Sequence, residues 1–235
     1  AAFGGVTVEP GSSSNNLIEG EPGAADPLFV EDPDAGDGDW STTADNIYGD
    51  LRLTFASPAI NMGVSTSGSS ANTTTNDILG NARFVGPIDL GAVEYFDPYP
   101  AWIDQFYPNE TDPAIVGETA DPSGNGLSNI LSFITDTSPL ASSASPITVE
   151  RDTTEISFSF PRRDDAAVRN PFVEYSTDLT NFDPALDGID GFTILVEDDA
   201  FGTSSDGVGI DKVTVSISRS ALTLLFGRLA VPSFD

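Results

Sequence analysis

The side chains that could carry chemistry in this chain are almost all carboxylates. The sequence holds 37 Asp and Glu against 9 Lys and Arg, and it contains neither His nor Cys. Without these two residue types, a Ser-His-Asp triad, a cysteine nucleophile and thiolate or imidazole metal ligands are excluded. Oxygen ligands remain, and they suit a hard cation such as Ca²⁺.

One stretch matches the spacing of a calcium loop. An EF-type loop places oxygen ligands at positions 1, 3, 5, 7, 9 and 12, with Gly at position 6 for the sharp turn. When the count starts at Asp121, Gly126 falls at position 6. The ligand positions are then Asp121, Ser123, Asn125, the Leu127 carbonyl, Asn129 and Ser132. Only Asp121 is charged and the closing Glu is missing, so we expect either a metal-free turn or weak Ca²⁺ binding, and no other cofactor.

A dense acidic run lies near the start of the sequence. Its five carboxylates are Glu31, Asp32, Asp34, Asp37 and Asp39. They could form a surface calcium site or a carboxylate pair flanking a glycosidic bond, and the adjacent Trp40 could stack on a sugar. The interleaved Pro33, Gly36 and Gly38 are strong turn formers, so the favoured interpretation is a hydrated turn.

The basic side chains do not suggest a catalyst. The first 150 residues contain only Arg52 and Arg83. Arg52 lies between two leucines of a predicted strand and should point outward. A second basic group, which reads as a salt-bridged turn, comprises Arg162, Arg163, Asp164 and Asp165. We therefore predict no catalytic residue and no enzymatic activity.

The overall charge limits the partners. A net charge of −28 repels nucleic acid, because phosphate binding requires clustered Lys and Arg. No stretch approaches the roughly 18 apolar residues of a membrane helix, so membrane insertion is not expected. We hypothesise a saline setting, since ions would screen the repulsion between the acids.

Composition and turn residues divide the chain into three parts. Proline and glycine are crowded between residues 96 and 126, and this seam separates a strongly acidic first part from the rest. The predicted parts are a first unit at residues 1–97, a Pro-rich linker that holds the calcium-like loop and a short helix at 98–145, and a strand-rich unit at 146–235. Trp102, Phe106 and Tyr107 in the seam are interpreted as packing residues.

Short apolar runs predict strands in the first part. They are separated by stretches rich in Gly, Asn, Ser and Asp, and residues 65–76 read as an exposed loop. The candidate strands cover residues 16–18, 28–30, 51–55, 59–62, 83–85 and 90–95.

The last part shows clearer alternation of apolar and polar residues. Residues 155–160 and 212–218 place an apolar residue at every second position, as in half-buried strands. Further strands are expected at 172–176, 192–197 and 222–231, which together predict a β-sandwich. One short helix is expected at 128–134, where Ser128 can cap the start.

Residues 26–95 resemble the C-terminal end of secreted bacterial right-handed parallel β-helix proteins. The resemblance rests on four ordered motifs, DPLFV (26–30), SPAINMG (57–63), DILGNAR (77–83) and DLGAVEY (89–95). It implies that these residues close a solenoid. The residues with structural roles would be Asp77, Arg83, Asp89 and Glu94.

A second resemblance covers the rest of the chain. DPSGNGLSNIL (121–131) is similar to the calcium-loop-and-helix element that precedes a C-terminal β-sandwich in large secreted proteins of environmental bacteria, and VEYSTDLTNF (173–182) fits the same module. The two resemblances imply an all-β chain: terminal coils of a parallel β-helix, one short helix, and a C-terminal β-sandwich.

Such modules usually form the C-terminal end of adhesins, surface proteins and polysaccharide-active enzymes. We therefore expect a non-catalytic, extracellular or cell-surface protein with a structural or adhesive role. The alternative is an ancillary carbohydrate-binding portion of a secreted polysaccharide-degrading enzyme, with Trp40 and Trp102 contacting the sugar.

The first residues suggest a partner. Residues 3–8 are apolar, β-prone and uncharged, and nothing comparable to the closing motifs protects that side of the expected solenoid. Either the chain continues a parent solenoid, or this edge pairs with another copy and builds a polymer or filament. We favour the polymer, and polysaccharide remains the other candidate partner.

Overall fold

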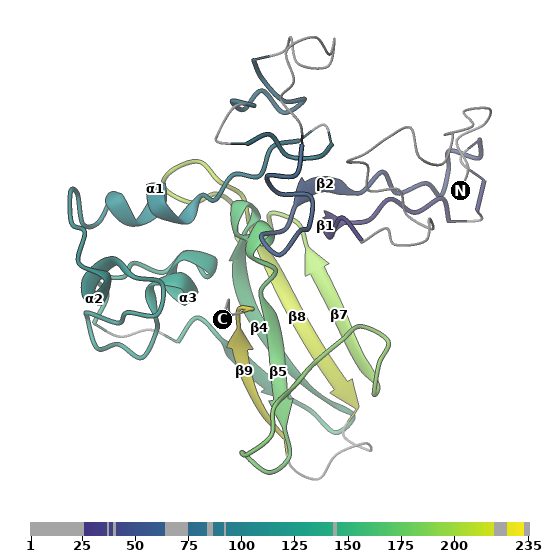
Figure 1. Ribbon diagram of the computed structural model, residues 1–235. Helices are drawn as coiled ribbons and strands as arrows, with labels where there is room; N and C mark the ends of the chain where they lie inside the picture. Colours follow the sequence, from purple (N-terminus) through teal and green to yellow (C-terminus); the bar gives the residue numbers. More distant parts are fainter. Residues whose placement is uncertain are drawn as a thin grey trace. The chain divides into compact units, whose positions relative to one another are not determined.

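The computed structural model describes residues 26–36, 38–39, 41–63, 75–83, 87–91, 93–142, 145–218 and 225–232 (Figure 1). The chain divides into two compact units, Ala1–Asp97 and Pro98–Asp235. Strands outnumber helices in length and number among the described residues, so the all-β prediction is confirmed at the level of fold class.

The first unit contains one antiparallel strand pair. Strand β1 (Phe29–Glu31) pairs with β2 (Asp50–Leu53), and the register shifts between Phe29 and Glu31. Leu53 is the buried residue that this strand pair contributes, and the chain that follows adds further core residues. These are Phe55, Ala59, Ile88 and Val93.

The expected parallel coils are not seen in the described part of this unit. Its strand pair and its two isolated bridges, Asp34–Ile47 and Asn76–Ala82, are all antiparallel. The predicted strands at 28–30 and 51–55 correspond to β1 and β2. Those at 59–62 and 90–95 form turns and bends in their described residues. Several predictions fall outside the described residues: the candidate strand at 16–18, the apolar stretch 3–8, residues 84–85 of the candidate strand at 83–85, and most of the predicted loop at 65–76.

Buried carboxylates explain why turns replace strands here. Asp89 accepts hydrogen bonds from the backbone N–H groups of Asn61 and Tyr95, and Asp77 accepts from those of Asn81 and Glu94. A side chain that bonds backbone N–H groups competes with ladder hydrogen bonds and favours a turn. The structural role implied for Asp77, Asp89 and Glu94 thus has a physical basis, because all three are buried.

The second unit contains two antiparallel sheets. The four-stranded sheet has the order β3-β4-β8-β7, and the three-stranded sheet has the order β6-β5-β9. The strand bounds are β3 (Thr148–Arg151), β4 (Glu155–Arg163), β5 (Phe172–Ser176), β6 (Asp183–Pro184), β7 (Phe192–Glu197), β8 (Ile210–Ser218) and β9 (Phe226–Ala230). The strand predictions at 155–160, 172–176, 192–197 and 212–218 are therefore confirmed.

Alternation places the core between the two sheets. Phe160 of β4 and Val215 of β8 come from the larger sheet, and Val173 of β5 and Leu229 of β9 come from the smaller one; all four belong to one buried cluster. Each of these side chains is at most 8% exposed, as expected for a β-sandwich-like arrangement.

Three short α-helices contribute to the same core. They are α1 (Tyr99–Asp104), α2 (Pro113–Val116) and α3 (Asn129–Ile134), and Figure 1 shows them gathered beside the sheets of their unit. Trp102, Phe133 and Ile134 join the buried cluster. Only α3 was predicted. Ser128 stands at its N-cap position, but the Ser128 side chain makes no capping bond.

Helices α1 and α2 correct the interpretation of the seam as linker. Both have proline in the first turn, where the missing N–H costs no hydrogen bond. Asp112 caps α2, because its side chain accepts from the Ala114 N–H at 2.9 Å. A 3₁₀ helix, η2 (Asp164–Arg169), follows β4. In the described ranges, no helix reaches the length and apolar character that a membrane crossing requires.

Candidate metal centre

Among the described residues, one close group of three carboxylates lies at a corner of the four-stranded sheet. Strands β4 and β7 flank β8 and both run antiparallel to it, so their ends lie beside the start of β8. This topology brings together Asp164 at the start of η2, Asp198 just after β7, and Asp211 on β8. One carboxylate oxygen from each lies within 4.8 Å of the others.

Hydrogen bonds fix the positions of these groups. Asp211 is 4% exposed and accepts from Arg162 Nη2 at 2.7 Å and from the Asp199 N–H at 3.1 Å. The Asp164 N–H donates to the Gly209 carbonyl at 3.0 Å. Gly209 lies against the carboxylates of Asp164 and Asp199, so a side chain at this position would collide with both.

The negative charge at this corner exceeds the local positive charge. Arg162 forms an ion pair with Asp211. Burial, followed by repulsion from Asp211, Asp199 and Asp198, raises the pKa of Asp164 to about 6. A proton on Asp164 is therefore one way to relieve the repulsion.

A bound cation would relieve the same repulsion. The donors are carboxylate oxygens alone, which matches the preference of Ca²⁺ and excludes a preference for soft metals. Three residues, Asp164, Asp198 and Asp211, could supply the first ligands to such an ion.

The negative charge of a second, neighbouring group of aspartates is compensated by a buried arginine. The Arg163 side chain is 2% exposed and contacts Asp165, Asp206 and Asp136 at distances of 2.8 to 3.1 Å. Its guanidinium also lies 5.3 Å from the centre of the Phe133 ring. Burial alone would lower the pKa of Arg163, but the hydrogen bonds that it donates to Asp165 and Asp206 hold the pKa above its ordinary value.

The carboxylates around Arg163 are affected differently. The hydrogen bonds from Arg163 lower the pKa of Asp206 to about 2, in spite of partial burial. Burial raises the pKa of Asp136, and its contact with Arg163 does not fully offset that rise. The predicted salt bridge between Arg163 and Asp165 is present, at 2.9 Å.

The predicted calcium loop is held by its own hydrogen bonds. Asp121 accepts from the Ser123 hydroxyl at 3.3 Å and from the N–H groups of Asn125 and Gly126 at 3.2 and 2.8 Å. Asn125 in turn accepts from the Leu127 N–H at 2.7 Å. These bonds bring Asp121, Ser123 and Asn125 together at the turn.

The last two predicted ligand residues, Asn129 and Ser132, lie in helix α3 and are buried. The Asn129 side chain is buried and donates to the carbonyls of Ile115 and Gly117, at the end of α2. Ser132 is fully buried in α3, and its hydroxyl has no hydrogen-bond partner among the described residues. Occupancy of the loop by Ca²⁺ stays a prediction.

The acidic run of the first unit forms turns in its described residues. Asp34 accepts from the Gly36 N–H, and Asp39 accepts from the Ser41 N–H, both at 2.9 Å. These are side-chain-to-backbone turns of the type that Asp favours, as the hydrated-turn interpretation requires. Asp37 and Trp40 lie outside the described residues.

The remaining singled-out residues have structural contacts. Arg52 pairs with Asp50 at 2.5 Å, and Arg83 donates to the Gly91 carbonyl. Trp102 is 4% exposed and packs against Phe106 and Phe133, which confirms its interpretation as a packing residue. Little of the Trp102 side chain is therefore accessible to a sugar.

Sequence reasoning missed two of the three aspartates at the acidic corner. Asp164 and Asp165 stood out beside two arginines, whereas Asp198 and Asp211 carried no local signal. They join Asp164 only through strand register, which pairs Arg162 with Asp211 across 49 residues of sequence.

Comparison of the chain with family models, with curated proteins and with solved structures found no match.

Proposed function

We propose that this chain is a non-catalytic structural or adhesive module that acts outside the cell or at its surface. The observation that carries the proposal is a β-sandwich-like unit in a chain whose basic side chains mostly form ion pairs with carboxylates. In the described part of the chain, ion pairs with carboxylates engage Arg52, Arg162, Arg163, Arg169, Lys212 and Arg228. Groups committed in this way are poorly placed to act as general bases.

The charge of the surface supports an extracellular setting. A chain with a net charge of −28 and no Cys gains nothing from a reducing compartment and stays hydrated where salt screens its carboxylates. Parallel β-helix coils in the first unit, continued by a parent solenoid or by another copy, remain part of the proposal. They rest on the four quoted motifs alone.

A first test addresses catalysis and location together. Incubation of the purified chain with a panel of polysaccharides should release no reducing ends, and antibody against the chain should label intact cells. Release of sugar ends that scales with protein concentration would overturn the non-catalytic role. Labelling that requires permeabilised cells would overturn the location.

A second test addresses self-assembly. Electron microscopy and light scattering should show regular assemblies of the intact chain, and deletion of residues 1–8 should abolish them while leaving the C-terminal sandwich folded. If both forms are monodisperse monomers, the polymer is excluded and the parent-solenoid alternative gains support.

A further inference from the structure

One exposed turn of the second unit carries the sequence of an N-glycosylation site. Asn109, Glu110 and Thr111 form the triplet Asn-X-Ser/Thr, with a middle residue other than proline. In exported proteins this triplet is the acceptor for an oligosaccharide, and the asparagine that carries it lies at the surface. The sequence contains one other such triplet, at 72–74, which lies outside the described residues.

The conformation of this turn follows from its residues. The Glu110 N–H donates to the Tyr107 carbonyl at 3.1 Å, so residues 107–110 form a β-turn between α1 and α2. Pro108 is the second residue of the turn, and Asn109, the third, has a φ of 63°. This is the pattern of a type II turn, whose third residue needs a positive φ that Gly and Asn adopt readily.

Hydrogen bonds to the backbone hold the turn on both sides of Asn109. The Asp104 carboxylate, at the end of α1, accepts from the Asn109 N–H at 3.1 Å. The Glu110 carboxylate accepts from the N–H groups of Thr111 and Asp112 at 2.8 and 3.0 Å. The backbone of the triplet is therefore positioned without any contribution from the Asn109 carboxamide.

The two side chains that N-glycosylation requires are accessible. Asn109 and Thr111 are both exposed, and among the described residues no hydrogen bond engages the Asn109 carboxamide or the Thr111 hydroxyl. The Asn129 carboxamide, by contrast, is buried and donates to two backbone carbonyls. Figure 1 shows the connection between α1 and α2 on the side of these helices away from the sheets of their unit, so a sugar chain attached there would extend into solvent.

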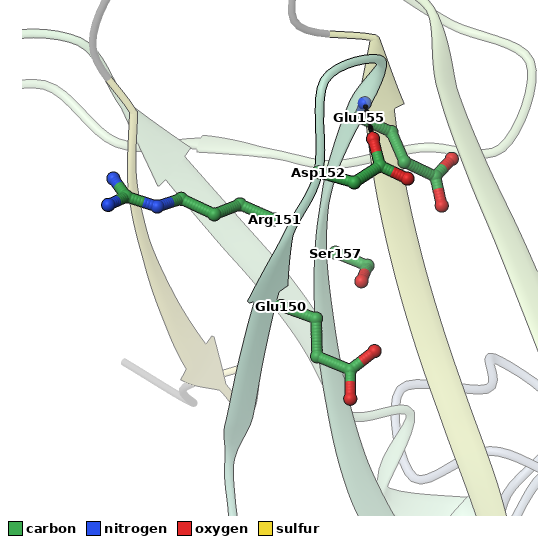
Figure 2. Close-up of a pocket in the computed structure, with 5 residues that line it drawn as sticks. All are labelled: Glu150, Arg151, Asp152, Glu155 and Ser157. Carbon is green, nitrogen blue, oxygen red and sulfur yellow. Dashed lines mark hydrogen bonds between the residues drawn. The ribbon is translucent and has the colours of Figure 1, made fainter.

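The hollow beside the β3–β4 hairpin contains no comparable motif. Figure 2 shows the residues that line it, which are Glu150, Arg151, Asp152, Glu155 and Ser157. Asp152 closes the hairpin by accepting from the Glu155 N–H at 2.9 Å, and the hollow is an open polar surface. The Asn109 turn differs from it, because its residue types and their order define one specific modification.

We propose that Asn109 is an N-glycosylation site. The second substrate is an oligosaccharide joined through its C1 atom to a lipid phosphate. The bond between C1 and the phosphate oxygen breaks, a bond between C1 and Asn109 Nδ2 forms, Nδ2 loses one proton, and the lipid phosphate leaves. The transferring enzyme recognises the Thr111 hydroxyl, two residues after the acceptor. This inference rests on the proposed extracellular setting, because such transfer accompanies export.

Mass spectrometry of the full chain isolated from its own cells tests the site. Trypsin cleaves after Arg83 and Arg151, and the peptide 84–151 contains the triplet at 109–111 and no other. This peptide should carry added mass made up of sugar units, and fragmentation should locate that mass on Asn109. An unmodified peptide from protein that antibody labels on intact cells would overturn the site and leave the proposed location intact. An unmodified peptide from protein that is labelled only in permeabilised cells would overturn both.

Substitutions expressed in the same cells test the role of each residue of the triplet. Asn109→Asp keeps a residue that adopts positive φ but removes the amide nitrogen, so the added mass should be lost. Thr111→Ala should also lose it, whereas Thr111→Ser keeps the hydroxyl and should retain it. Glu110→Gln is the matched control, because it keeps an acceptor for the same N–H groups and should stay modified. Added mass on peptide 84–151 that persists in Asn109→Asp or in Thr111→Ala would overturn the proposal.

Discussion

Replacement of Asp206 by Asn should destabilise the second unit by about 2 kcal/mol at pH 7. The Asp206 carboxylate is held by Arg163 through two contacts of 2.8 and 3.1 Å, and its pKa falls from the ordinary 3.8 to about 2. A shift of this size corresponds to about 2.5 kcal/mol of stability for the ionised form, and Asn retains part of the hydrogen bonding. The predicted loss of stability is therefore somewhat smaller than the full value for the ionised form.

The sign of the pH dependence follows from the lowered pKa. The stabilisation by Asp206 is complete above the unfolded pKa of 3.8, and it is lost as the pH falls through about 2. The difference between wild type and Asp206→Asn should thus be constant near neutral pH and should shrink below about pH 4.

Asp136→Asn is the matched control, because Asp136 contacts the same guanidinium at 3.0 Å. Burial raises the pKa of Asp136, so the neutral side chain should not destabilise the fold at pH 7. Urea unfolding followed by Trp102 emission gives the free energies, in a Trp40→Phe background that leaves Trp102 as the single tryptophan. Equal losses for the two variants, or a loss for Asp206→Asn that persists unchanged at pH 3, would refute the reasoning.

Three further predictions use the acidic corner, the Asp121 loop and the net charge. Asp164→Asn should raise the free energy of unfolding at pH 8 by up to about 3 kcal/mol, because the pKa of about 6 lies above 3.8, and the gain should fade as the pH falls from 6 to 4; equal urea midpoints at pH 8 in EDTA would contradict it. Calorimetry should show Ca²⁺ binding to the Asp121 loop at millimolar concentrations or not at all, and micromolar binding lost in Asp121→Ala would prove this wrong. The melting temperature should rise from very low to near-molar NaCl, because salt screens a net charge of −28; a flat response would mean that each acid is locally compensated.

Strand identity could be predicted where alternation was regular. Residues 155–160 and 212–218 alternate over their whole length, and they form the two central strands of the larger sheet. The first unit offered no such period, because Asp77 and Asp89 bond backbone N–H groups and convert apolar runs into turns. A side chain that redirects backbone hydrogen bonds across 28 residues leaves no periodic trace in the sequence.

The helices and the carboxylate clusters were hidden for different reasons. Prolines made residues 98–145 read as a linker with one short helix, although proline in a first turn is compatible with a helix. The partners of Arg163 come from three places in the chain, Asp136, Asp165 and Asp206, and only Asp165 is close in sequence. Strand order determines which of these distant residues come into contact, and a single sequence does not reveal strand order.

The shared core of helices and sheets has a consequence for how the second unit folds. Its buried cluster runs from Tyr99 to Leu229, so the core is complete only when the last strand is in place. A fold dominated by contacts between distant residues closes slowly, because long loops must be ordered before those contacts form. During synthesis, the cluster that contains Trp102 and Phe133 stays incomplete until more than 90 further residues have been added, and an incomplete core can associate with other unfinished chains. The strong charge repulsion between copies then acts during folding, as a kinetic barrier to association before the core closes.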